Sequence, residues 1–382
     1  MSTRPFNQAP RSAYIHVPFC RHRCGYCNFT LVAGRDDLVD AFLEAIEREL
    51  RHLDGPREVD TLFFGGGTPT HLPAPQLARL IAIARKSFPL AAGGEFSVEA
   101  NPIDLDRQQA DVLAAGGVTR ISLGVQSFHP WKLTALERDH TSADIESAFR
   151  LARNVAESVS VDLIFGIPGE SLAAWQQDLD MALALKPDHV STYGLTFEKG
   201  TSFWGRLLRG ELVRVDEDQE REFYLAAIDT LTAAGYEHYE VSNFARPGDR
   251  CRHNETYWTG GGYYAAGPGA ARFIGGKREI NHRSTTTYIR RVLDGQSPMA
   301  ESEQLPPQDA ARERLVFALR RLEGVDLNEF HRETGFNVAE LVGKRLPSLL
   351  ELGLLEQIGS QLRLTRSGLL ISDSIWPQFL NA

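Results

Sequence analysis

Three cysteines near the start of the chain have the spacing of a metal-binding loop. Cys20, Cys24 and Cys27 form the pattern C-x3-C-x2-C. Zinc sites and four-iron clusters are usually closed by four protein ligands, so three thiolates in one loop leave a coordination position open. An open iron can take the amino and carboxylate groups of S-adenosylmethionine (SAM), whose reductive cleavage gives a radical. The triplet therefore predicts a 4Fe–4S cluster with SAM as a second cofactor.

The alternative for these cysteines is a set of unconnected buried or redox-active thiols. A disulfide framework is not expected, because the fourth cysteine of the chain, Cys251, lies far away in sequence. Arg21, His22 and Arg23 make the loop positive, which favours thiolate over thiol. We therefore interpret the loop as a metal site.

A run of glycines supplies a second candidate contact with the cofactor. Gly65, Gly66 and Gly67 are followed by Thr68 and come directly after an apolar segment. Glycine allows backbone N–H groups to approach a ligand that a Cβ atom would exclude. The run is not a phosphate-binding P-loop, because no G-K-[ST] follows it. A plain tight turn is the alternative, and next to the cysteine loop we favour contact with the methionine end of SAM.

Four more polar residues stand where a ligand with an amine, a carboxylate and a ribose would need them. Glu99 and Asp162 suit the amine or the ribose hydroxyls, Gln126 offers a donor and an acceptor, and Arg138 suits a carboxylate. Ordinary loop polarity or ion pairing is the alternative for each of them.

A second concentration of chemistry lies in the segment C-R-H-N-E-T-Y-W, residues 251–258, which a glycine run and two tyrosines follow. An imidazole, His253, close to the rings of Tyr257 and Trp258 suits a flat apolar ligand with a metal at its centre, and histidine is a standard haem ligand. An aromatic hairpin with a hydrogen-bonded structural histidine explains the same residues, and their chemistry alone leaves both readings open.

The elements that must position these residues alternate between strands and helices. Strands are predicted at 14–17, 61–64, 95–99, 120–124, 159–164 and 189–195, and helices at 37–53, 74–88, 106–115, 142–157, 172–185 and 216–234. Repeated β-then-α units imply a parallel sheet. Six units are fewer than the eight of a closed barrel, so we predict an α/β fold with a partial (β/α)6 TIM-like barrel. The functional rim of such barrels lies where the strands end. Five of the candidate features fall there: the cysteine loop, the glycine run, Glu99, Gln126 and Asp162.

The last part of the chain has a different character. After a Pro-Pro linker at 306–307 come helices at 309–322, 327–334 and 338–352, a short hairpin at 354–364 and a last helix near 367–374. This order predicts a mostly helical, winged-helix-like domain. Its 12 acidic and 9 basic residues between 301 and 382 do not favour DNA binding. We divide the chain into a barrel (1–240), a connecting segment (241–300) and a C-terminal domain (301–382).

The composition narrows the class of partner. The 382 residues carry a net charge of −9, which does not favour nucleic acid, and no segment approaches the roughly 20 apolar residues of a transmembrane helix. The first thirteen residues contain no apolar core of a signal peptide, so a cytoplasmic location is expected.

The segment Y-I-H-V-P-F-C at 14–20, with the cysteine spacing, resembles the radical SAM superfamily. Within it, the chain resembles the branch that contains oxygen-independent coproporphyrinogen III oxidase and the haem chaperones of the HemW type. Further matching segments are 65–70, 97–102, 124–128 and 162–169, and the resemblance extends over nearly the whole chain.

The resemblance implies a role for each matching residue. It implies that the cysteine triplet binds the 4Fe–4S cluster and that nine residues line the SAM site: Tyr14, Tyr26, Gly66, Gly67, Thr68, Glu99, Gln126, Arg138 and Asp162. It also implies haem contacts from the H-N-x-x-Y-W motif: His253, Asn254, Tyr257 and Trp258.

One position separates the two kinds of protein in this branch. The oxidase pattern has a fourth cysteine two residues after the third, and here that position is Phe29. The H-N-x-x-Y-W motif, which the chaperones carry, is intact. The resemblance thus implies a haem chaperone that passes haem to an acceptor protein, with an electron donor for the cluster. The alternatives are a coproporphyrinogen oxidase that decarboxylates propionates, or a radical enzyme acting on haem itself.

Overall fold

The computed structural model describes residues 9–381. Residues 1–8 and 382 lie outside the described residues. They belong to the predicted barrel and C-terminal domain, and residues 1–8 are part of the segment inspected for a signal peptide. Across the described range, no helix is both long and apolar enough to cross a membrane.

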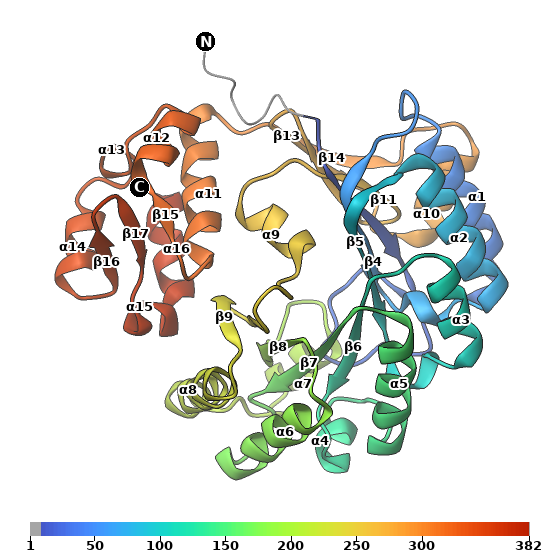
Figure 1. Ribbon diagram of the computed structural model, residues 1–382, viewed down its shortest axis with the longest axis horizontal. Helices are drawn as coiled ribbons and strands as arrows, with labels where there is room; N and C mark the ends of the chain where they lie inside the picture. The colour runs from blue at the N-terminus through green and yellow to red at the C-terminus, as the bar shows by residue number, and fades with distance from the viewer. Residues whose placement is uncertain (1–8, 382) are drawn as a thin grey trace.

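A twisted, mostly parallel sheet forms the centre of the molecule (Figure 1). Within residues 9–381 it has nine strands in the order β11-β1-β4-β5-β6-β7-β8-β10-β9. The six central ones run parallel and contain the six predicted strands: β1 (Ser12–Val17), β4 (Val59–Gly66), β5 (Leu90–Ala100), β6 (Arg120–Gln126), β7 (Ser158–Phe165) and β8 (His189–Gly194). This confirms the α/β fold with an open, partial barrel.

Three short strands extend the sheet at its two edges. β11 (Tyr264–Ala266) pairs in parallel with β1, while β10 (Asn243–Ala245) pairs antiparallel with β8 and with β9 (Glu237–Glu240). With three or four residues each, these strands are too short to show an alternating pattern in the sequence. β11 brings the segment that follows the H-N-x-x-Y-W motif beside the strand that leads to the cysteines.

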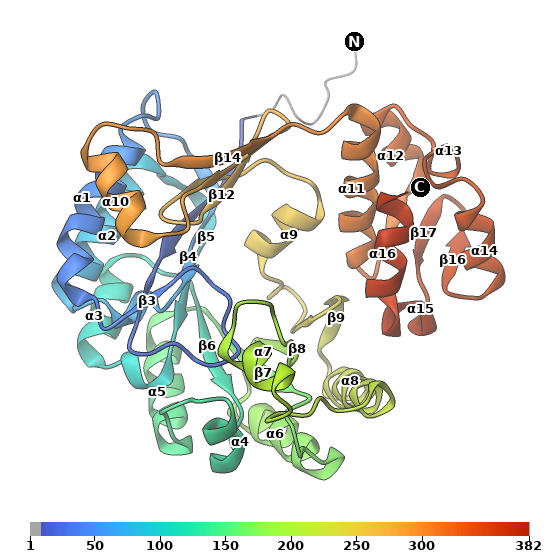
Figure 2. The ribbon, with the colours of Figure 1, turned by 180° about the vertical axis from the view of Figure 1, so that it is seen from behind.

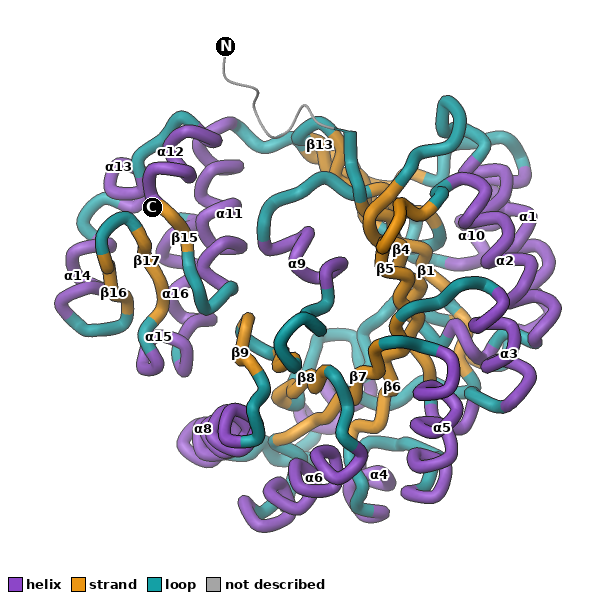
Figure 3. Tube along the Cα trace, in the orientation of Figure 1, coloured by secondary structure: helices purple, strands orange, loops and turns teal. Residues whose placement is uncertain are grey.

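Helices cover the outer face of the curved sheet, as the tube in Figure 3 shows. The six predicted barrel helices are present as α1 (Val39–Leu50), α2 (Ala74–Ser87), α3 (Arg107–Ala115), α5 (Ser142–Val155), α6 (Leu172–Leu185) and α8 (Glu217–Ala233). α1 shows why they pack there: Phe42, Ile46 and Leu50 recur every four residues and are buried against the sheet. Two shorter helices, α4 (Pro130–Ala135) and α7 (Ser202–Leu208), lie in the later β-to-α connections.

A small antiparallel sheet leads from the barrel to the C-terminal domain, as Figure 2 shows from behind. It consists of β12 (Ala271–Ile274), β13 (Lys277–Asn281) and β14 (Met299–Glu303), with α10 (Thr285–Leu293) packed on α1. The buried Glu49 of α1 ties this crossover to the barrel, because it accepts hydrogen bonds from Tyr288, Asn281 and the backbone of Gly267.

The C-terminal domain has the predicted order of helices followed by a hairpin. Its helices are α11 (Pro307–Arg320), α12 (Leu327–Thr334), α13 (Val338–Val342), α14 (Arg345–Glu351), α15 (Arg366–Leu370) and α16 (Ser372–Leu380). The strands β15 (Val325–Asp326), β17 (Gln361–Leu364) and β16 (Leu355–Ile358) form a small sheet in that spatial order. The domain is winged-helix-like, as predicted. The division of the chain at 240 and 300 stays a prediction.

Candidate functional site

The three cysteines line one cavity of about 550 Å³ at the carboxyl ends of the barrel strands. Their loop leaves the barrel through the short strand β2 (Phe19–Cys20) and returns through β3 (Val32–Ala33), which pairs with it. We call this space the cysteine cavity. Eight of the nine predicted SAM contacts line it as well: Tyr26, Gly66, Gly67, Thr68, Glu99, Gln126, Arg138 and Asp162. Residues from five parallel strands and their loops thus meet at one site.

The arrangement of the thiols suits a cluster of several irons. Among the described residues, no three His, Cys, Asp or Glu side chains lie close enough to hold a single metal ion. In a 4Fe–4S cluster each thiolate binds a different iron, so the three sulfurs do not need to meet at one point. Cysteine sulfur is also the usual ligand of such clusters. The loop therefore fits the cluster that the sequence predicts.

The charge of the loop does not activate the cysteines as expected. Burial raises the pKa of the Cys20 thiol to about 12 and also raises the pKa of Cys27. The loop cations point elsewhere: Arg21 pairs with Asp104 at 3.1 Å, and Arg23 donates to the backbone oxygen of Leu31 at 2.9 Å. The expectation that loop charge favours thiolates is wrong for these two cysteines, because desolvation outweighs it. A metal that displaces the protons has to supply the driving force.

Glu99 is the main acidic group of the cavity. Its Oε2 accepts a hydrogen bond from the backbone N–H of Gly66 at 3.0 Å. Burial raises the pKa of Glu99 to about 7, and the nearby Asp162 adds to this effect. Burial also raises the pKa of Asp162, although Ser122 donates a hydrogen bond to it at 3.1 Å. A cationic ligand would stabilise both carboxylates in their charged form, which fits the amine of SAM.

The glycine run gives the backbone its path beside the cavity. Gly66 has a φ of +108°, and a Cβ atom there would lie 2.3 Å from the imidazole of His16. Gln126, at the end of β6, has a φ of +66°, which is strained for a residue with a side chain. Strain of this kind gathers at functional sites, and both positions border the cysteine cavity.

Arg138 completes the polar wall. It donates to the backbone oxygen of Gly124 at 2.9 Å and approaches the sulfur of Cys24 at 3.8 Å. Its buried Nε has no hydrogen-bond partner within the described chain. An unpaired buried N–H on a guanidinium suits an anionic group of a ligand, such as a carboxylate.

Tyr14 lies outside the cysteine cavity. Its ring is stacked on Phe63 with the centroids 6.0 Å apart, and its hydroxyl contacts Nδ1 of His16 at 3.0 Å. Conversely, the prediction omitted Tyr193, at the end of β8, which lines the cavity. The rule that strand ends carry the site would have found it. Phe29, where the oxidase pattern has its fourth cysteine, also lines the cavity and is 60% exposed.

The H-N-x-x-Y-W motif forms a short helix, α9 (Arg252–Trp258), on the open side of the barrel. It is not a hairpin. Tyr257 and Trp258 line a second cavity of about 730 Å³, which we call the aromatic cavity. The β12–β13 hairpin, the linker before α11, α11 itself and the end of α12 provide the other walls. Six of the lining residues are aromatic: Tyr257, Trp258, Tyr263, Phe273, Phe317 and Phe336.

His253 and Asn254 do not line the aromatic cavity. His253 is 1% exposed and lies behind Tyr257, four residues later on the same face of α9. Its Nδ1 contacts the Thr61 hydroxyl at 2.9 Å and its Nε2 contacts the Tyr257 hydroxyl at 2.9 Å. Burial lowers the pKa of His253 to about 3, so the imidazole is neutral.

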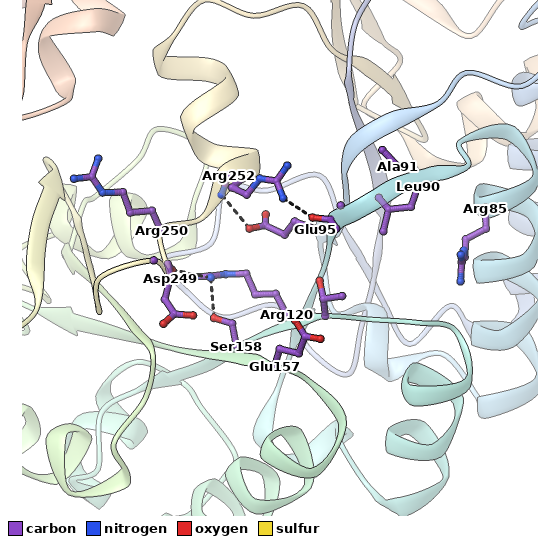
Figure 4. A pocket seen from close by; sticks show the side chains of 14 residues that line it. Arg85, Leu90, Ala91, Glu95, Arg120, Glu157, Ser158, Asp249, Arg250 and Arg252 are labelled. Carbon is purple, nitrogen blue, oxygen red and sulfur yellow. Dashed lines mark hydrogen bonds between the residues drawn. The ribbon is translucent and has the colours of Figure 1, made fainter.

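α9 is anchored at the amino-terminal end of the barrel, beside a polar cavity of about 430 Å³. Figure 4 shows the side chains that line this cavity. Glu95 of β5 accepts hydrogen bonds from the backbone N–H groups of Arg252 and His253 at 3.0 and 3.1 Å. The Arg252 side chain donates to the oxygen of Gly93 at 2.7 Å. Nearby, the buried Arg120 donates to Ser158 and to the backbone of Asp249. One carboxylate thus satisfies the free N–H groups at the start of the helix.

Comparison with known proteins agrees with this geometry. Residues 14–182 match the family described as the radical SAM superfamily, and residues 305–371 match the HemN C-terminal domain. The chain is 35% identical to the heme chaperone HemW of Bacillus subtilis over 97% of this chain and 99% of that protein. It is 38% identical to the heme chaperone HemW of Mycobacterium tuberculosis over 97% and 95%.

Among solved structures, the chain is similar to that of coproporphyrinogen III oxidase (HemN) from Escherichia coli, described as a radical SAM enzyme. The TM-score is 0.85 and the identity 25%, with 97% of this chain and 90% of that chain covered. The likeness includes the C-terminal domain as well as the barrel.

Proposed function

The chain belongs to the radical SAM superfamily and, within it, to the family of HemW heme chaperones; from this premise we propose that it binds haem and transfers it to an acceptor protein. The observation that carries the proposal is the aromatic cavity, which two residues of the H-N-x-x-Y-W motif line beside the barrel. Its volume of about 730 Å³ lies within the ~300–1,000 Å³ of small-molecule sites.

The chemistry of the aromatic cavity suits haem. Its rings can stack on a flat apolar macrocycle, and Trp258 already contacts the Phe317 ring and the Arg320 guanidinium. Arg314 on the wall pairs with Glu333 through one nitrogen, and its guanidinium suits a propionate carboxylate. The buried Nη1 of Arg314 has no hydrogen-bond partner in the described part of the chain, so it can donate to a carboxylate of a bound ligand.

The cysteine cavity holds the second part of the proposal. Cys20, Cys24 and Cys27 would bind a 4Fe–4S cluster, and the cavity residues would position SAM beside it. When bound, the cluster supplies an electron, which an electron donor must replace. Arg138 would orient the carboxylate of SAM, and Glu99 would neutralise its amine. A cytoplasmic location, where thiols stay reduced, belongs to the same proposal.

The alternative is a coproporphyrinogen oxidase, which the structural likeness to HemN favours. Phe29 at the position of the fourth cysteine argues against it. In this alternative, the porphyrinogen would have to enter the cysteine cavity, where its propionates could meet a radical. In the chaperone, haem stays in the aromatic cavity.

One experiment separates the two functions. The cluster is reconstituted without oxygen, and the same sample is used for a haem titration and for a coproporphyrinogen turnover assay with SAM and a reductant. Stoichiometric haem binding, together with haem transfer to an apo-haemoprotein and no protoporphyrinogen, supports the chaperone. Turnover of coproporphyrinogen with no haem bound would establish the oxidase instead.

A further inference from the structure

His253 cannot reach an iron in the aromatic cavity without losing both of its hydrogen bonds. Thr61 donates its own hydroxyl proton to Ser12 at 2.9 Å, so it accepts from Nδ1–H of His253. Nε2 is then the bare nitrogen, and it accepts the hydroxyl proton of Tyr257. The imidazole is also stacked on Phe63 at 4.9 Å. Nδ1 therefore holds α9 against β4, and Nε2 fixes the Tyr257 side chain one turn further along the same helix.

Tyr257 is engaged in the same contact. Its ring forms part of the cavity wall, but its hydroxyl is bound to His253 on the barrel side. Burial raises the pKa of Tyr257, and no cation is among the groups that act on it. This hydroxyl is therefore poorly placed to become a charged iron ligand.

Tyr263 differs in both respects. It lines the aromatic cavity, and its backbone is fixed to Phe273 of β12 by two hydrogen bonds of 2.9 and 3.0 Å. Arg278 of β13, another lining residue, pairs with Phe273 across the β12–β13 hairpin, so it flanks the same residue that binds the Tyr263 backbone. Burial raises the pKa of Tyr263; the Arg278 guanidinium opposes this effect, and the Glu313 carboxylate adds to it. Glu303 and Glu313 hold Arg278 in place at 3.2 and 2.7 Å.

We propose that Tyr263 is the axial ligand of ferric haem in the aromatic cavity, that Arg278 stabilises its phenolate, and that His253 is a positioning residue for Tyr257. The inference rests on the proposed haem-binding function. Tyrosine is an established haem ligand. The phenol loses its proton to solvent, the Fe–O bond forms as a water molecule leaves the iron, and the iron stays ferric. A phenolate oxygen is a hard ligand, so binding selects ferric over ferrous haem.

The test compares three variants of the full-length chain with the wild type. Tyr263→Phe removes only the hydroxyl. Tyr264→Phe is the matched control, because the neighbouring ring is 7% exposed and packs on Phe88. His253→Gln tests the positioning role. Ferric haem is titrated into each protein, and the bound form is examined by optical, EPR and resonance Raman spectroscopy, with circular dichroism as the check of folding.

We expect phenolate vibrations and a high-spin ferric signal in the wild type and in the Tyr264→Phe protein. Tyr263→Phe should lose the phenolate signature and bind haem at least about 10-fold more weakly. His253→Gln should bind more weakly but keep the signature, and reduction of the iron should lower the affinity of the wild type. A Tyr263→Phe protein with the wild-type spectrum, or a His253→Gln protein whose ligation is restored by added imidazole, would overturn the assignment. A wild type that binds no haem would refute the proposed function as well.

Discussion

The raised pKa of Glu99 predicts that SAM binding weakens as the pH falls through about 7. Only the carboxylate can neutralise the ammonium group of SAM, so the affinity should follow the ionised fraction of Glu99. With a pKa of about 7, that fraction falls by about 15-fold between pH 7 and pH 5.5, which corresponds to about 1.6 kcal/mol of binding free energy. The α-amino group of SAM remains charged throughout this range, because its pKa lies near 8.

The assay is isothermal titration of SAM into the cluster-loaded protein at several pH values in this range. Glu99→Gln should bind SAM more weakly at pH 7 and show little further loss below it. Glu198→Gln, which alters another carboxyl group on the wall of the cysteine cavity, should keep the wild-type pH profile. A pH-independent affinity in the wild type, or the same profile in Glu99→Gln, would refute the reasoning.

The folding equilibrium should respond to the same group with the opposite sign. The ordinary pKa of a glutamate is 4.5, so between about 4.5 and 7 the folded chain binds more protons at Glu99 than the unfolded chain does. The contribution of Glu99 to stability therefore rises as the pH falls through this window. Acidification should therefore weaken SAM binding, while the contribution of Glu99 to the free energy of unfolding increases. A loss of SAM affinity at low pH can thus be distinguished from partial unfolding.

Three further predictions concern the cluster, the barrel and the motif helix. After reconstitution, the Cys24→Ser protein should lack the iron and sulfide that the wild type binds. Cys251→Ser should keep them, because Cys251 is 3% exposed and its thiol is bound to Glu95. Equal iron contents in the two variants would contradict the ligand assignment. Lys132→Met should lower the free energy of unfolding, measured in urea, by about 3–5 kcal/mol. Lys132 is fully buried, and its loss leaves the buried carboxylates of Glu170 and Asp178 without a cation. A change below about 1 kcal/mol would contradict this. Glu95→Ala should reduce haem affinity but not iron content, because two N–H groups at the start of α9 lose their acceptor, at a cost of about 1–3 kcal/mol each. Glu157→Gln is the control, since Glu157 is exposed and lines the same polar cavity as Glu95.

Much of the cysteine cavity could be predicted because the relevant rule concerns topology rather than contacts. Parallel strands end at one edge of a sheet, so polar residues at strand ends must meet there. Glu99, Gln126 and Asp162 satisfy this condition. Asp162 of β7 and Tyr14 of β1 both lie three residues before the end of their strands, but only Asp162 lines the cavity, so strand position alone does not separate them. The SAM contact of Tyr14, which the resemblance implies, stays a prediction.

The environment of the H-N-x-x-Y-W motif could not be predicted in the same way. The spacing of His253 and Tyr257 is compatible with one face of a helix, but the partner of that face is Thr61 on β4, nearly two hundred positions earlier in the chain. Nor does the sequence show that Glu95 binds the first turn of α9. These contacts depend on how the chain returns to the open side of the barrel, and no local pattern encodes such a path.

The pairing of β11 with β1 also has a consequence for the order of folding. Ala13 pairs with Tyr264, so this edge of the sheet closes one of the longest loops in the chain. Closing so long a loop costs entropy that only the assembled barrel can offset, and a ribosome releases the early strands well before β11. The aromatic cavity is therefore completed last, because most of its walls, from Phe273 to Phe336, follow β11 in sequence. A nascent chain can close the barrel around its cysteines while it still has no place to hold a haem.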